Sequence, residues 1–366
     1  MRIAYDFQAF SQHYGGVALY FSKLATHINS ALDNARIFAP FFQNRYVHSL
    51  PVEMVEGKFL AQYPYKSKRI IWKLNQLLSS SKISAWHPDI YHQTYYQFNP
   101  PSFGETARIV TIYDMTHELF SESFLPNDPT PNLKRKAIEH ADHVICISES
   151  TRNDLIRLVG IDKKKTSCIY LGVDPVMHKF EYPLIFNQSA KPYLLYVGTR
   201  MGYKNFLGLL RAYASSEKLK KDFNLLIVGG GRLTKNEKQA ILNLNLLPEQ
   251  VLTIDADATQ INAFYRHASA FIYPSLYEGF GLPPLEAMAN GCPVVVSNAA
   301  SMPEVIGTAG EYFDPNSTEE LAFAIEQVVY SDTRSQELRL LGYQQASLFT
   351  WDRCAKETLN LYKELI

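Results

Sequence analysis

The sequence predicts an α/β protein made of two doubly wound, Rossmann-like parallel-sheet domains that face a cleft. With 366 residues, the chain exceeds what one hydrophobic core usually holds, so two domains are expected. Short apolar runs typical of buried strands alternate with helical segments, and the alternation occurs twice along the chain. We therefore expect an N-terminal domain over residues 1–175, a linker over 176–191 and a C-terminal domain over 192–350.

The composition fits a soluble globular protein. Hydrophobic residues make up 46% and charged residues 20%, and the formal net charge is 0, so no general attraction to nucleic acid is expected. The cysteines are widely spaced and form no CxxC pair, which indicates buried thiols in a reducing compartment. No signal-peptide pattern and no apolar run long enough to span a bilayer is found, so we expect a cytoplasmic location.

The first domain begins with a strand at Arg2–Tyr5, followed by Gly15 and Gly16 and a helix that extends to about Ile28. A glycine turn between a strand and a helix can direct backbone N–H groups at an anion. The same pair is equally consistent with a tight turn that needs positive φ. Further strands are predicted at 35–40, 89–92, 108–113 and 141–148.

Residues 66–78 predict a basic, aromatic-bearing amphipathic helix around Trp72. Such a helix suits the surface of an anionic membrane. The alternative is a helix that packs on its own domain and keeps its lysines in water.

His117 follows the strand at 108–113 by a few residues. Ligands of open parallel sheets bind at the carboxyl ends of the strands, so this histidine is placed to meet a substrate. The alternative is a histidine with a purely structural role.

The second domain begins with a strand at 192–198, after which Arg200 and Lys204 stand four residues apart. An arginine fork and a lysine point charge suit a diphosphate, whereas solvated loop charges are the alternative. The glycines after the strand at 224–228 do not form a dinucleotide fingerprint, because Thr234 occupies the position of the last glycine, and this excludes an NAD-dependent dehydrogenase. Asp257 is expected to cap a helix rather than bind a metal.

The most informative stretch follows a strand at 270–273, where a loop at 278–282 leads into a helix that begins with Pro283 and Pro284. The N–H groups of Phe280, Gly281 and Leu282 suit a phosphate at this helix start. Carboxylates flank it at Glu278 and Glu286, and carboxylates accept hydrogen bonds from sugar hydroxyls. The loop thus predicts a nucleotide-sugar ligand, while an ordinary strand–loop–helix unit with solvated glutamates is the alternative.

Glu278 and Glu286, with the core EGFGLPPLEAM, the lead-in Pro274-Ser275 and the tail through Pro303-Glu304, resemble the Glu-x7-Glu motif of retaining glycosyltransferase family 4, which has the GT-B fold. Similar segments are YGGVALYF at the first glycine turn, TIYDMTHE around His117 and YVGTRMGYKN around Lys204. The sequence departs from the family at Tyr113, where many members have His, and at Tyr203, where common members have Arg.

The resemblance implies a metal-independent, retaining hexosyltransferase without a cofactor. It implies catalytic roles for His117, Glu278, Arg200 and Lys204, and ribose binding by Glu286. It also implies that the final helix, within residues 351–366, packs back on the first domain.

The expected donor is GDP-mannose, with UDP-sugars and dTDP-rhamnose as alternatives. The expected acceptor is a glycan or lipid-linked oligosaccharide in surface polysaccharide synthesis. With such an acceptor, the expected cytoplasmic protein could also bind peripherally to the inner face of the cytoplasmic membrane. A non-catalytic nucleotide-sugar-binding subunit is the alternative of another class.

Overall fold

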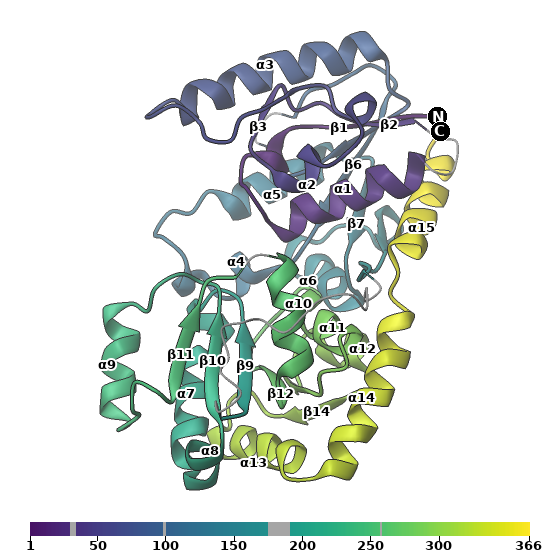
Figure 1. Ribbon diagram of the computed structural model, residues 1–366. Helices are drawn as coiled ribbons and strands as arrows, with labels where there is room; N and C mark the ends of the chain where they lie inside the picture. The colour runs from purple at the N-terminus through teal and green to yellow at the C-terminus, as the bar shows by residue number, and fades with distance from the viewer. Residues whose placement is uncertain (30–33, 98–99, 175–190, 257) are drawn as a thin grey trace. The chain divides into compact units, whose positions relative to one another are not determined.

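The computed structural model describes residues 1–29, 34–97, 100–174, 191–256 and 258–366, which form two units (Figure 1). Unit 1 comprises Met1–Glu118, Leu125–Gly172 and Trp351–Ile366, and unit 2 comprises Leu119–Phe124 and Val173–Thr350. The predicted linker, apart from Lys191, and the predicted helix cap Asp257 lie outside the described residues.

Unit 1 contains a six-stranded parallel sheet in the order β2-β1-β5-β6-β7-β8. Its strands are β1 (Arg2–Tyr5), β2 (Asn34–Ile37), β5 (Ile90–Gln93), β6 (Ala107–Ile112), β7 (His143–Cys146) and β8 (Thr166–Cys168). Its helices are α1 (Gly16–Asn29), α2 (Arg45–His48), α3 (Lys68–Trp86), α4 (Thr116–Leu119), α5 (Thr130–His140), α6 (Glu149–Val159) and α15 (Trp351–Glu364). A separate pair, β3 (Phe41–Phe42) and β4 (Lys58–Phe59), is also parallel.

The helix predicted at 66–78 is α3, and it continues to Trp86, so the predicted end is wrong. Ser79 and Ile83 extend the buried face, and the Ser79 hydroxyl donates to the Phe38 carbonyl over 2.8 Å. Burial of these side chains outweighs the modest helix propensity of the three serines that follow Leu78.

The last helix, α15, belongs to unit 1 and lies beside α1 (Figure 1). Its Tyr362 hydroxyl lies 2.5 Å from Nδ1 of the buried His92, whose Nε2 is 2.8 Å from the Thr111 hydroxyl. A carboxylate oxygen of Asp352 in the same helix lies 3.5 Å from Nε2 of His27 in α1. The apolar face of α15 therefore completes the core of unit 1 with residues that are distant in sequence.

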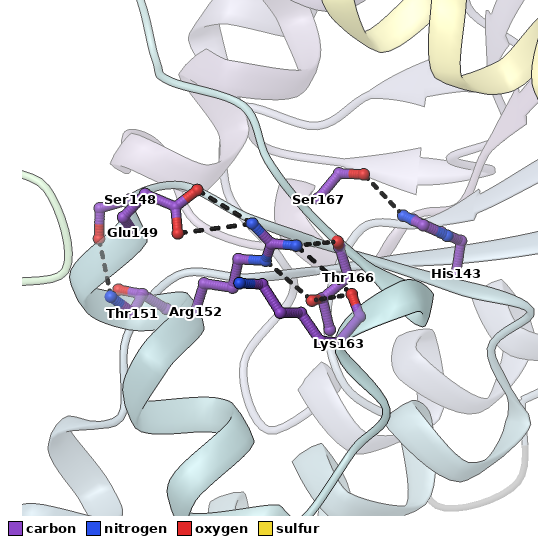
Figure 2. Close-up of polar contacts among 8 residues, drawn as sticks. All are labelled: His143, Ser148, Glu149, Thr151, Arg152, Lys163, Thr166 and Ser167. Atoms are coloured by element: carbon purple, nitrogen blue, oxygen red, sulfur yellow. Dashed lines mark hydrogen bonds and ion pairs between the residues drawn. The ribbon is translucent and has the colours of Figure 1, made fainter.

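A polar network holds the outer part of the unit 1 sheet together (Figure 2). Ser148 caps α6, since its hydroxyl accepts from the Thr151 N–H at 2.9 Å. One turn later, Arg152 donates to the hydroxyl and carbonyl oxygens of Thr166, each at 2.9 Å, and to Glu149 at 3.1 Å. These contacts bind the start of α6 to the edge strand β8.

Unit 2 contains the second six-stranded parallel sheet, in the order β11-β10-β9-β12-β13-β14. Its strands are β9 (Tyr193–Val197), β10 (Asn224–Val228), β11 (Val251–Ile254), β12 (Ala270–Tyr273), β13 (Val294–Ser297) and β14 (Gly310–Phe313). Its helices are α7 (Phe206–Ser215), α8 (Glu217–Asp222), α9 (Lys235–Asn243), α10 (Ala258–His267), α11 (Leu282–Ala289), α12 (Met302–Ile306), α13 (Thr318–Val329) and α14 (Asp332–Ser347).

In order along the chain, the strands of unit 2 follow the Rossmann arrangement 3-2-1-4-5-6. The two sheets confirm the predicted pair of doubly wound domains. The edge strand β14 was not predicted from the sequence, because its glycine and glutamate interrupt the apolar pattern.

Candidate active site

The candidate site lies at the point in the unit 2 sheet where the strand order reverses. The chain leaves β9 toward β10 on one side, and it leaves β12 toward β13 on the other. Connections that diverge in this way leave a crevice at the carboxyl ends of the two central strands, which is where open α/β sheets bind ligands. Lys204 follows β9, and Glu278 follows β12.

These two residues form an ion pair. Lys204 Nζ lies 2.6 Å from Glu278 Oε1 and 3.4 Å from the Tyr273 hydroxyl. The ammonium also lies over the rings of Tyr203 and Tyr273, at 5.2 and 5.5 Å from their centroids. Both charged side chains are largely buried, with 16% and 11% exposed, so the pair is stronger than one in open solvent. The structure thus brings together Lys204 and Glu278, two predicted site residues that are distant in sequence.

The loop that carries Glu278 is held in place from α12 and the residue before it. The Ser301 hydroxyl lies 2.8 Å from the Glu278 carbonyl oxygen and 2.9 Å from that of Phe280. Gly281 has φ of +105°, and a Cβ there would lie 2.4 Å from Met302 Cε. Only glycine fits this position without strain.

Helix α11 begins at Leu282, one residue after Gly281. The first N–H groups of a helix have no acceptor within it. Pro283 and Pro284 have no N–H, so Leu282 supplies the only backbone donor among the first three helical residues. An anion at this helix start would therefore be bound by Leu282 and by the loop N–H groups before it, together with the helix dipole.

Glu286 lies on α11, one turn after the helix start. Its Oε2 is 3.2 Å from the buried Tyr265 hydroxyl. Burial raises the pKa of Glu286; the Tyr265 hydrogen bond opposes this shift, and the charge of Asp174 adds to it. The residue as a whole is half-buried.

Arg200 has a different environment from the one expected. Its side chain is only 3% exposed, and Nε lies 2.8 Å from Glu237 Oε1. Nη1 donates to the Gly229 carbonyl at 2.9 Å, and Nη2 donates to the carbonyls of Gly230, Gly231 and Arg232 at 3.0 to 3.2 Å. The two Nη atoms therefore hold the glycine turn after β10, while Nε holds Glu237 of α9. Lys204 is the cation that lies beside Glu278.

The glycine turn of unit 1 has little structural need for glycine. Neither Gly15 nor Gly16 has a positive φ, so the interpretation as a turn that requires one is wrong. A Cβ on Gly16 would meet no atom within 4 Å, and one on Gly15 would lie 3.8 Å from Gln12 Oε1. Both residues are exposed at the start of α1, and the close approach of a ligand to them stays a prediction.

His117 lies in α4, directly after the carboxyl end of β6. Its Nε2 is 3.7 Å from Asp128 Oδ2, and its side chain is 20% exposed. Burial lowers the pKa of His117, while the nearby carboxylates act in the opposite direction. Tyr113, the other candidate for the family histidine, uses its hydroxyl to donate to the Thr94 carbonyl at 2.9 Å.

Sequence reasoning missed two buried charged residues of unit 1. Asp6, directly after β1, is 2% exposed and accepts from the Tyr91 hydroxyl and Gln97 Nε2, each at 2.6 Å. Lys134 is 1% exposed and contacts Glu118 at 2.8 Å. A signal for Lys134 was present in the sequence, because it shares one helix face with Ala137 and Ile138 at spacings of three and four residues.

Two kinds of feature are absent from the described part of the chain. Among those residues, no helix is both long enough and apolar enough to cross a membrane. Within the same residues, no group of three or more His, Cys, Asp or Glu side chains is arranged to bind a metal ion.

Two family models match the chain. The model described as Glycosyltransferase Family 4 matches residues 14–176, and the model described as Glycosyl transferases group 1 matches residues 184–344. Together they extend over nearly the whole sequence, one on each half.

Curated relatives and solved structures agree with these matches. The chain is 29% identical over 299 residues to O-antigen chain mannosyltransferase B of Escherichia coli, covering 74% of each chain. It is 26% identical over 221 residues to O-antigen chain mannosyltransferase RfbU of Salmonella typhimurium, covering 60% of each. Among solved structures, a sucrose-phosphate synthase from Thermosynechococcus elongatus superposes with a TM-score of 0.76 at 21% identity, covering 100% and 99% of the two chains. HepE of Anabaena, in complex with UDP and glucose, superposes with a TM-score of 0.73 at 18% identity, covering 100% of each chain.

Proposed function

This chain belongs to glycosyltransferase family 4 and has the GT-B fold, and on that premise we propose that it transfers mannose from GDP-mannose to a glycan acceptor. The observation that carries the proposal is the buried Lys204–Glu278 pair at the strand-order reversal of unit 2, beside the start of α11. The choice of mannose follows the names of the relatives, which are O-antigen mannosyltransferases.

The proposed donor contacts follow from the charges of unit 2. Lys204 neutralises the diphosphate, helped by the N–H groups of Phe280, Gly281 and Leu282 and by the dipole of α11. Glu278 and Glu286 accept hydrogen bonds from hydroxyls, Glu278 from the transferred sugar and Glu286 from the ribose. Arg200 contributes by holding the glycine turn after β10, rather than by touching the diphosphate.

Unit 1 is proposed to contribute His117, which orients the donor sugar, and the open glycine pair Gly15 and Gly16. A neutral imidazole can donate one hydrogen bond and accept another, as the orientation of a sugar hydroxyl requires. The burial that lowers the pKa of His117 favours this neutral form near pH 7.

We propose retention at the anomeric carbon, with neither metal nor cofactor required. The bond between the anomeric carbon and the leaving phosphate oxygen breaks, and a bond to the acceptor oxygen forms on the same face. The acceptor proton passes to the leaving phosphate. Lys204 and the loop N–H groups stabilise the charge that develops on this phosphate, a contribution of roughly 3–4 kcal/mol per well-placed donor.

The acceptor is proposed to be a lipid-linked oligosaccharide at the inner face of the cytoplasmic membrane, and α3 is the proposed contact with that membrane. Ile71, Asn75, Ser79 and Ile83 form its buried face. On another face, Ile70, Leu74 and Leu77 follow helical spacing and are 63%, 42% and 70% exposed. The exposed basic residues Lys66, Arg69 and Lys73 lie near this apolar stripe. An apolar stripe flanked by positive charges is suited to binding the surface of an anionic membrane.

A sedimentation experiment with vesicles tests this contact. The protein is expected to sediment with vesicles rich in phosphatidylglycerol and to remain in the supernatant with phosphatidylcholine alone. Leu77→Asp should weaken sedimentation. The matched control is Leu242→Asp, at a leucine of α9 in unit 2 that is 66% exposed. Equal sedimentation of Leu77→Asp and the parent protein would rule out α3 as the contact.

The donor is tested by measuring hydrolysis and transfer with GDP-mannose, UDP-hexoses and dTDP-rhamnose in parallel. GDP-mannose is expected to be consumed fastest, and GDP to raise the melting temperature more than UDP or dTDP at equal concentration. A clear preference for UDP or dTDP would replace the donor but keep the reaction type. Nucleotide binding without turnover of any donor would favour a non-catalytic nucleotide-sugar-binding subunit.

A further inference from the structure

Lys134 is a charged side chain inside unit 1 that the proposed chemistry does not yet use. It lies on α5 with 1% of its side chain exposed. Its Nζ is 2.8 Å from Glu118 Oε2 and 2.8 Å from the Asp114 carbonyl oxygen, and it lies 5.7 Å from the centroid of the Tyr96 ring. Burying an ammonium is costly unless it is paired and hydrogen-bonded, and all three contacts compensate for that cost.

The two oxygen atoms that Lys134 contacts lie on either side of His117 in sequence. Asp114 begins the turn after β6 and Glu118 follows His117 directly. Inside the turn, the Thr116 N–H donates to Asp114 Oδ1 at 2.9 Å. Lys134 therefore ties both ends of the five-residue segment that presents His117.

The same region of chain contacts the imidazole itself. Asp128, just before α5, lies 3.7 Å from His117 Nε2, and its other oxygen accepts from the Thr130 N–H at 2.8 Å. The start of α5 thus contributes an anion beside His117 through Asp128 and a buried cation one turn later through Lys134.

The charges around His117 act in opposite directions. Burial of the ring lowers the pKa of His117, and the positive charge of Lys134 lowers it further. The carboxylates of Asp114, Asp128 and Glu118 each raise it. Lys134 is the cation in this group of charges, and its partner Glu118 lies next to His117 in the chain.

We propose that Lys134 is a positioning residue of the transfer reaction: it fixes the Asp114–Glu118 turn that presents His117 through its contacts with the Asp114 carbonyl and the Glu118 carboxylate, and its buried positive charge adds to the burial of the ring in favouring a neutral imidazole. The inference rests on the proposed role of His117 in transfer. A purely structural lysine would stabilise the turn equally well, but it would have no effect on the protonation of His117.

Removal of either partner tests the proposal with opposite expected effects. Lys134→Met leaves the carboxylate of Glu118 without its partner, so the titration midpoint of His117 is expected to rise by about half a pH unit or more. Glu118→Gln leaves the ammonium without its partner, so the midpoint is expected to fall. Lys134→Arg keeps the positive charge, so its His117 midpoint is expected to stay close to that of the parent protein.

The midpoint is measured by NMR on protein with labelled histidine, with His117→Asn used to assign the resonance. The matched control is Lys136→Met on the same helix, whose side chain is 41% exposed and pairs with Glu139, and it should leave the midpoint in place. Circular dichroism establishes that each variant is folded. If Lys134→Met does not fold, the proposal is tested by Glu118→Gln alone, in which the midpoint of His117 should fall.

A second measurement connects the charge to transfer. In Lys134→Met, the acid limb of the profile of kcat/KM against pH is expected to shift to higher pH, by the same amount as the NMR midpoint of His117. An unchanged midpoint in folded Lys134→Met or Glu118→Gln would overturn the proposal, and so would a shifted midpoint with an unmoved acid limb. If the parent protein transfers no sugar from any donor, the proposed function fails, whereas the NMR result still reports on the charge around His117.

Discussion

Lys204 Nζ lies 2.6 Å from Glu278 Oε1, although 74 residues separate the two in the chain. The strands that precede them, β9 and β12, are neighbours in the unit 2 sheet. The pair therefore exists because two parallel strands end at the same edge. A diphosphate bound by Lys204 would weaken this contact and release Glu278 to accept from a sugar hydroxyl.

Replacement of Glu278 by glutamine is expected to reduce kcat by about 100-fold to 1000-fold, because the transferred sugar loses a charged acceptor. The affinity for GDP should change little. Stopped assays of mannose transfer and calorimetric titration with GDP measure the two quantities. Glu217→Gln, at a glutamate whose side chain is 89% exposed, is the control. Undiminished turnover in Glu278→Gln would remove this residue from the site.

Replacement of Lys204 by methionine is expected to weaken GDP binding by about 10-fold to 100-fold, the effect of losing a hydrogen bond to a charged group. Binding of guanosine, which has no phosphate, should not change. Lys204→Arg should recover part of the GDP affinity. Equal losses for GDP and guanosine would mean that Lys204 supports the pocket without contacting phosphate.

Arg200 provides the contrasting case, since its guanidinium contacts Glu237 and the carbonyls of the glycine turn. Arg200→Lys cannot reproduce this fork, so it is expected to lower the free energy of unfolding by about 2 kcal/mol. Urea denaturation measures the change. A variant that keeps its stability and loses only GDP affinity would show that Arg200 contacts the diphosphate after all.

Gly281 and Gly16 are expected to respond differently to alanine. Gly281→Ala has to adopt φ of +105° and displace Met302, so it should lower the free energy of unfolding by about 1–3 kcal/mol. Gly16→Ala meets no atom within 4 Å and should leave stability unchanged. If a ligand approaches this turn closely, Gly16→Ala will raise KM; unchanged kinetics would exclude the turn from ligand binding.

His92 predicts how stability depends on pH. Burial lowers the pKa of His92 to about 3 in the folded protein, below its ordinary value of 6.5. Between these values the unfolded chain binds the proton and the folded chain does not. The contribution of His92 is therefore complete above pH 6.5 and is lost as the pH falls toward 3, at up to about 1.4 kcal/mol per pH unit.

Urea denaturation of the parent protein and of His92→Gln at pH 7 and pH 5 measures this effect. His92→Gln should be less stable at pH 7, because it disturbs the contacts with Tyr362 and Thr111. Its loss of stability between the two pH values should be smaller than that of the parent protein. An equal loss in both proteins would assign the pH dependence to other groups.

Local sequence determined most strands of the two large sheets, the predicted helix starts and the loop that carries Glu278. Apolar runs such as Ala270–Tyr273 specify buried strands, and the Pro283-Pro284 pair followed later by Gly291 marks the limits of α11, because proline and glycine restrict the backbone without help from the rest of the fold. The glycosyltransferase family was likewise recognisable from contiguous motifs.

Only the tertiary structure decided which charged side chains meet. Arg200 and Lys204 look alike in sequence, yet one is enclosed by the carbonyls after β10 and the other pairs with Glu278. The helical spacing of Lys134 indicated that it lies on a buried face, but it did not identify its partner Glu118, which lies 16 residues away. Electrostatic contacts of this kind depend on distance in space, which the order of strands in a sheet sets and the local pattern of residues does not record.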